Sequence, residues 1–124
     1  ANIDFAGYRD NPFGYMAFCD CLVLSSHYEG LPSVLVEGLA CGCRIVSVDC
    51  PSGPAEILEG GRYGVLVPPE DAQALKDGII RALKDTPCRE TLIRRAKDFS
   101  VSGAVQAYER ELGKIADNFR RQEK

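Results

Sequence analysis

Two glutamates, Glu29 and Glu37, stand on either side of a short segment that contains Gly30 and Pro32. Glycine lets the backbone approach a ligand closely, and proline suits the first turn of a helix. The first N–H groups of a helix lack intrahelical acceptors and attract anions such as phosphate. A carboxylate can accept hydrogen bonds from two neighbouring hydroxyls, as on a ribose or a hexose. The pattern therefore indicates a site for a sugar nucleotide, although two solvated surface charges would leave the same pattern.

The other candidate reactive groups are six cysteines: Cys19, Cys21, Cys41, Cys43, Cys50 and Cys88. They include two Cys-x-Cys pairs, whereas structural zinc sites more often use Cys-x2-Cys. The sequence opens on a strand-like segment and not on a secretory signal, which favours a compartment where thiols stay reduced. We therefore expect no metal site, and thiols that act as small buried apolar side chains. We expect His27 to be a solvated loop residue.

Length and composition are typical of one soluble globular domain. The chain has 124 residues, of which 45% are hydrophobic and 27% charged, and its net charge is −3. A nucleic-acid-binding domain would normally carry a basic face, so no nucleic-acid partner is expected. No apolar run approaches the roughly 20 residues that a membrane span needs. We therefore expect a cytoplasmic protein.

Apolar runs and turn signals predict alternating strands and helices before three final helices. The predicted strands are residues 3–8, 21–24, 44–48 and 64–67. The predicted helices are residues 12–19 with Asn11 as N-cap, 32–41, 55–58, 71–84, one opened by Thr86 and Pro87, and 102–121. This alternation predicts an α/β fold, a Rossmann-like parallel sheet with helices on both faces. Ligands of such sheets bind beyond the carboxyl ends of the strands, which here means loops 8–11, 25–33 and 49–55.

The three final helices each carry an apolar stripe, which we expect to face the core. The stripes are Leu75, Ile79 and Leu83; Cys88, Leu92, Ala96 and Phe99; and Val105, Tyr108, Leu112, Ile115 and Phe119.

An ordered set of motifs resembles the family-four retaining glycosyltransferases. Glu29 and Glu37 match their Glu-x7-Glu motif. Further matches, in order, are FAGY at 5–8, NPFGYM at 11–16, GLACG at 38–42 and CPSGPAEIL at 50–58. Gly14 and Arg44 stand where that family often has proline. The resemblance covers about residues 3–85 and implies the donor-binding half of a GT-B fold, with two facing Rossmann-like domains.

The resemblance also implies roles for individual residues. It implies that Glu37 binds the ribose hydroxyls of the donor and that Glu29, the expected catalytic residue, lies beside the transferred sugar. The expected substrate-binding residues are Glu37, Gly30, Leu31, Pro32, Ser33, Tyr8 and Arg9, with the backbone amides near Pro32 approaching the diphosphate and Tyr8 and Arg9 lining the base. Pro32 has no N–H to donate. A solvated loop arginine remains the alternative for Arg9.

The resemblance implies retaining transfer of a hexose from a UDP- or GDP-sugar to a glycan or lipid-linked acceptor, without metal or cofactor. Residues 1–124 would then be part of the donor-binding domain of a longer protein. We expect its basic pair and acceptor domain to precede Ala1, and residues 101–122 to pack toward that domain. The whole protein is expected in the cytoplasm, with peripheral association at the inner face of the membrane. The alternatives are a donor-binding module that is inactive on its own, and a GT-B epimerase or phosphorylase.

Overall fold

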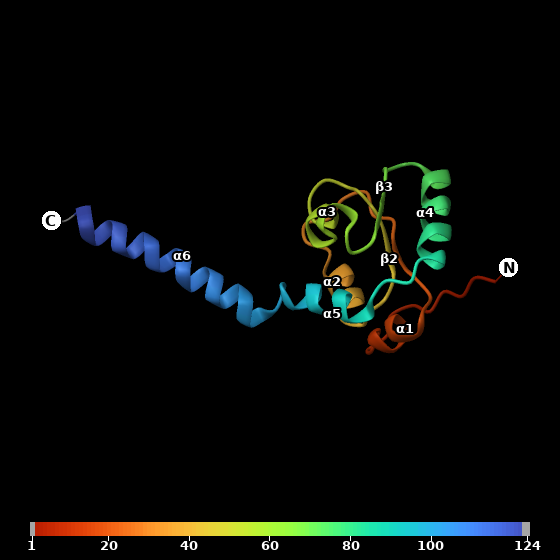
Figure 1. The fold of residues 1–124 in the computed structure, drawn as a ribbon, viewed down its shortest axis with the longest axis horizontal. Helices are drawn as coiled ribbons and strands as arrows, with labels where there is room; N and C mark the ends of the chain where they lie inside the picture. The colour runs from red at the N-terminus through yellow and green to blue at the C-terminus, as the bar shows by residue number, and fades with distance from the viewer. Residues whose placement is uncertain (1, 123–124) are drawn as a thin grey trace.

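The computed structural model describes residues 2–122, which form a small α/β body and one long helix that leaves it (Figure 1). The elements, in chain order, are α1 (Phe13–Phe18), β1 (Leu22–Leu24), α2 (Ser33–Ala40), β2 (Ile45–Val48), α3 (Pro54–Ile57), the 3-10 turn η1 (Glu59–Gly61), β3 (Val65–Val67), α4 (Ala72–Lys84), α5 (Arg89–Lys97) and α6 (Val101–Gln122). Every element predicted from residue 12 onward is present, and most of them agree within two residues at each end.

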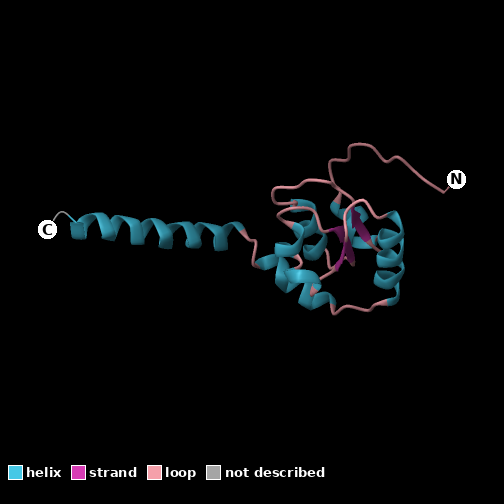
Figure 2. Ribbon diagram, turned by 90° about the horizontal axis from the view of Figure 1, so that it is seen from above, coloured by secondary structure: helices cyan, strands magenta, loops and turns pink. Residues whose placement is uncertain are grey.

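The three strands form a parallel sheet in the order β1-β2-β3. The register pairs Leu22 with Ile45 and Val46 with Val65. Helices α2, α3 and α5 lie on one side of the strands and α4 lies on the other (Figures 1 and 2). All four residues of β2 are buried, as expected for the central strand of a parallel sheet that is covered on both faces. The predicted α/β fold class is confirmed.

The sheet has one apolar cluster on each face. The cluster shared with α2, α3 and α5 contains Leu35, Leu39, Ile45, Ile57, Leu58, Leu92 and Ala96. The cluster shared with α4 contains Val46, Val48, Cys50, Val67 and Ala82. A Cβ added to Gly78 would stand 2.7 Å from Cγ1 of Val67, so glycine lets α4 approach β3 closely. These two clusters hold the strand ends, and hence the loops that follow them, in place.

The predicted strand at residues 3–8 is wrong. This segment is not part of the sheet, and Ile3, Phe5 and Tyr8 are 73%, 92% and 91% exposed. A strand is stabilised by a neighbour that takes up its backbone hydrogen bonds. No strand in residues 2–122 pairs with this segment, so its apolar side chains remain in solvent.

Two predicted helix starts are also wrong. Pro12, and not Asn11, is the N-cap of α1, and no side chain caps this helix. Helix α5 begins at Arg89, after Thr86 and Pro87. The chain is extended at Asp85, whose carboxylate accepts the Thr86 N–H at 2.8 Å. Residues 85–88 therefore form a connector between α4 and α5, and the Thr-Pro signal does not open a helix.

The apolar stripe of α6 does not face a core in this structure. Val105, Tyr108, Leu112, Ile115 and Phe119 are 48–72% exposed, and α6 points away from the body (Figure 1). The prediction that the stripes of α4 and α5 face the core is correct only in part. In the α5 stripe Leu92 and Ala96 are buried but Cys88 is exposed, and in the α4 stripe Leu83 is 48% exposed. Periodicity identified the apolar face of each helix but not whether another element covers it.

The cysteines differ from one another in exposure. All six are free thiols; Cys43 and Cys50 are buried as predicted, whereas Cys19 and Cys88 are exposed. Expecting all six to be buried was therefore wrong. None of the described helices combines the length and apolarity needed to cross a lipid bilayer.

Candidate functional site

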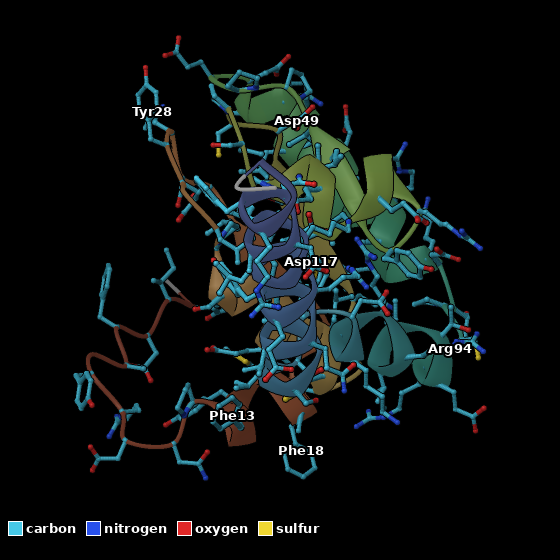
Figure 3. The ribbon with its side chains drawn as sticks, turned by 90° about the vertical axis from the view of Figure 1, so that its left-hand side faces the viewer. Phe13, Phe18, Tyr28, Asp49, Arg94 and Asp117 are labelled. Atoms are coloured by element: carbon cyan, nitrogen blue, oxygen red, sulfur yellow. The ribbon has the colours of Figure 1, made fainter. Side chains whose placement is uncertain are left out.

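The loops that follow β1 and β2 lie at the same edge of the sheet. Because the strands are parallel, their carboxyl ends meet there. Tyr28, in the loop after β1, and Asp49, just after β2, lie at the same end of the molecule, whereas Phe13 and Phe18 of α1 lie at the opposite end (Figure 3). This is the edge at which parallel α/β sheets bind their ligands.

The loop after β2 supports the loop after β1. The hydroxyl of Ser52 lies within hydrogen-bond distance of two backbone carbonyl oxygens, that of Pro51 at 2.8 Å and that of Glu29 at 3.2 Å. Gly53 has a φ of +89°, and a Cβ at that position would stand 2.8 Å from the carbonyl oxygen of Gly30 and would collide with the ring of Pro32. The sequence analysis pointed to this loop but missed the positioning role of Ser52 and Gly53. The signal was available, since loops after adjacent parallel strands are neighbours.

The start of α2 is open and keeps free N–H groups. Pro32 is the N-cap and has an extended backbone, and its carbonyl accepts the N–H of Leu35 at 3.0 Å. Ser33 and Val34 are the first two helical residues, and their N–H groups meet no acceptor within residues 2–122. Gly30 and Ser33 are exposed. Free amides at the positive end of a helix favour an anion, and binding of an anion at this helix start stays a prediction.

Glu29 and Glu37 flank this helix start in the continuous segment 29–37. Both side chains are half-buried, and neither carboxylate forms a hydrogen bond or ion pair with another residue of the described chain. Glu37 lies one turn inside α2, whose buried face consists of Leu35, Gly38 and Leu39. The two carboxylates therefore remain available to accept hydrogen bonds from hydroxyl groups of a ligand.

The structure does not bring Tyr8 and Arg9 to this segment. The side chain of Tyr8 is 91% exposed. Arg9 lines a hollow of about 370 Å³ beside α1 and the start of β1, and no residue of the loop at 25–32 lines that hollow. Their role at the base of a nucleotide stays a prediction. His27 is exposed in the loop, as predicted.

Leu31 and Pro32, just before the start of α2, differ in exposure. Leu31 is 57% exposed beside the helix start, and Pro32 is buried against Gly53. Within residues 2–122, no three side chains of the types that bind metals converge. The segment combines an open helix start with two acids whose carboxylates have no partner among residues 2–122.

A parallel sheet with an open helix start at its carboxyl edge is an arrangement at which α/β domains commonly bind their ligands. Residues 1–99 match the family model of the glycosyl transferases group 1. The chain belongs to this family, and its fold is part of the GT-B fold.

Curated relatives and solved structures are similar to this chain. It is 34% identical over 91 residues to the N-acetylgalactosamine-N,N'-diacetylbacillosaminyl-diphospho-undecaprenol 4-alpha-N-acetylgalactosaminyltransferase of Campylobacter jejuni, covering 73% of this chain and 25% of the relative. It is 30% identical over 111 residues to the lipopolysaccharide core biosynthesis glycosyltransferase LpsE of Rhizobium meliloti, covering 86% and 32%. The sucrose-phosphate synthase of Thermosynechococcus elongatus matches its structure with a TM-score of 0.56 at 28% identity, covering 86% of this chain and 26% of the synthase.

The matches cover only part of each relative. The chain spans about a quarter to a third of the length of the relatives it matches.

Proposed function

We propose that this chain binds the sugar nucleotide for a retaining glycosyltransferase, which transfers a hexose from a UDP- or GDP-sugar to a glycan or lipid-linked acceptor. The observation that carries the proposal is the open start of α2, with free N–H groups at Ser33 and Val34 between two unpaired acids, Glu29 and Glu37. The family match supports a transferase, and the site geometry supports a phosphorylated sugar as its ligand.

Each part of the segment has a role in this proposal. The amides of Ser33 and Val34 bind the diphosphate, and the positive end of α2 stabilises the charge that develops as the diphosphate departs. Glu37 accepts hydrogen bonds from the ribose hydroxyls. Glu29 accepts hydrogen bonds from hydroxyl groups of the hexose. Catalysis is mainly positioning and charge stabilisation, and a metal ion is not required.

The remainder of the protein supplies the acceptor site in this proposal. The chain spans about a quarter to a third of its relatives, and α6 presents an uncovered apolar stripe. We propose that the stripe within residues 101–122 packs against the missing part and that basic side chains from that part neutralise the diphosphate. The names of two relatives refer to an undecaprenol-linked sugar and to lipopolysaccharide, which supports a cytoplasmic enzyme at the inner face of the membrane.

A second proposal concerns the chain by itself: it binds donor but does not transfer sugar. This second proposal is favoured because the chain spans only about a quarter of the length of these relatives. Calorimetric titration with UDP, GDP and their sugars should show binding, and an assay for released nucleotide should show no turnover. Turnover by the purified chain would contradict this second proposal without affecting the first.

The Glu37→Ala variant tests the donor site. Hydrogen bonds to a charged group contribute about 1.5–3 kcal/mol, so losing the ribose contacts should raise the Kd for UDP or GDP roughly tenfold to 150-fold. Glu109→Ala is the matched control, because Glu109 is exposed on α6, far from the helix start in sequence. We expect the control to bind as the unaltered chain does. Equal Kd values for the two variants, with both folded by circular dichroism, would rule out the ribose role of Glu37.

A further inference from the structure

Two thiols that are distant in sequence lie in contact. The sulfurs of Cys19 and Cys43 are 3.2 Å apart although the residues are 24 positions apart. Both are free thiols, and Cys19 is exposed whereas Cys43 is 4% exposed. A disulfide requires the sulfurs at about 2.05 Å, so a local movement on the order of 1 Å would allow the bond to form.

The backbone holds the two thiols in this arrangement. Pairing of β1 with β2, and the hydrogen bond from Leu22 N–H to the Arg44 carbonyl at 2.8 Å, place the chain before each strand side by side. The N–H of Cys19 donates to Tyr15 at the end of α1, and that of Cys43 donates to Gly38 in α2. Both cysteines are therefore anchored to helices as well as to the sheet edge.

We propose that Cys19 and Cys43 are a modification site that forms a reversible disulfide when the protein meets a small-molecule disulfide such as oxidised glutathione. The thiolate of Cys19 attacks one sulfur of glutathione disulfide, forming a mixed disulfide and releasing one glutathione thiolate. Cys43 then loses its proton to solvent base, and its sulfur attacks that of Cys19, releasing the second glutathione. The protein loses two electrons and two protons in total, and the glutathione disulfide gains the two electrons.

Exposure determines the order of these steps. Cys19 can be reached by glutathione, whereas Cys43 is covered and its pKa is raised to about 12 by burial and by the adjacent Cys19 thiol. Cys43 is therefore protected from the external disulfide and reacts only with the sulfur already beside it. Burial also raises the pKa of Cys21, which makes it a poorer first nucleophile than exposed Cys19.

The disulfide would close a ring of residues 19–43, which contains the segment at 29–37 but leaves it open to a ligand. It spans β1, the loop with Glu29 and α2. The cross-link lies before the first residues of β1 and β2, at the sheet edge opposite the loops at 25–32 and 49–53. A closed ring of this size restricts the unfolded chain and should raise Tm by an amount on the order of 10 °C.

Intact-mass measurement and peptide mapping after treatment with glutathione disulfide test the proposal. We expect a Cys19–Cys43 disulfide, seen as the loss of two hydrogen atoms, and a glutathione adduct on exposed Cys88, whose pKa is lowered by hydrogen bonding from Thr91. Cys43→Ser should instead retain glutathione on Cys19, and Cys19→Ser should leave Cys43 unmodified. The control Cys88→Ser should lose only its own adduct and still form the ring.

Some results would overturn the proposal. They are a lasting glutathione adduct on Cys19 in the unaltered chain, a disulfide between Cys19 and Cys21, or an oxidised protein with the Tm of the reduced one. None of these measurements depends on donor binding, so the proposed function and this site fail independently.

Discussion

Replacing Gly53 by alanine should separate the two loops that build the candidate site. Gly53 has φ +89° and ψ −70°, a backbone conformation that an alanine adopts only with strain. The added Cβ would also stand 2.8 Å from the Gly30 carbonyl oxygen and against the ring of Pro32. The loop after β2 must then move away from the start of α2, together with Ser52, which binds Glu29.

The cost of Gly53→Ala has two parts. Backbone strain contributes about 1–3 kcal/mol, and overpacking against Gly30 and Pro32 adds about 1–3 kcal/mol. The free energy of unfolding should therefore fall by about 2–6 kcal/mol, a large share of the roughly 5–15 kcal/mol typical of a domain.

Gly60→Ala is the matched control for this experiment. Gly60 also has a positive φ, +64°, but an added Cβ would meet nothing within 4 Å. The free energy of unfolding of Gly60→Ala should fall by only about 1–2 kcal/mol, the cost of an alanine in the left-handed conformation. Urea unfolding gives the loss in free energy of unfolding for each variant, and the difference between the two losses measures the collision at Gly53. Calorimetric titration with UDP and GDP then measures whether the segment at 29–37 still binds nucleotide. If Gly53→Ala loses no more stability than Gly60→Ala, or binds nucleotide as tightly as the unaltered chain, then the loops do not support each other as described.

Three further predictions concern the body and its last helix. Arg95→Lys should lower the free energy of unfolding by about 1–3 kcal/mol in urea titrations, because the guanidinium donates to the carbonyls of Glu56 and Ile57 at 2.7 and 3.0 Å and lysine cannot donate to both in the same geometry. Burial and the neighbouring thiols raise the pKa of Cys43 from 9.0 to about 12, so the thiol ionises in the unfolded chain before it does in the folded one. Stability should therefore fall as the pH rises from about 9 to 12, and more steeply than in Cys43→Ala; parallel pH curves would contradict this. Leu112→Lys should change the stability of this chain by less than about 0.5 kcal/mol, because that side chain is 62% exposed, and a larger loss would show that α6 is covered.

Local sequence signals predicted the part of the molecule that carries the candidate site. The apolar runs at 21–24 and 44–48 contain the strands β1 and β2, of which β2 is buried and β1 is half-buried except at exposed Val23. Pro32 precedes helix α2, and Gly42, shortly after the helix ends, has the left-handed conformation. Parallel pairing then places the loops after these strands at one edge. These features depend on backbone preferences and on burial within one or two elements, which nearby residues encode.

Individual contacts between distant segments were not predicted. The sequence did not show that Ser52 holds Glu29 or that the sulfurs of Cys19 and Cys43 touch. Such contacts depend on how the elements pack together, and residue types alone do not specify that distance.

The sequence by itself therefore determined the order of strands and helices, the acidic pair and the open helix start between its members. Only the tertiary structure decided which apolar segments are covered, leaving residues 3–8 unpaired and the stripe of α6 in solvent. The physical reason is that a periodic pattern shows which face of a segment favours burial, whereas burial itself requires a partner surface elsewhere in the molecule.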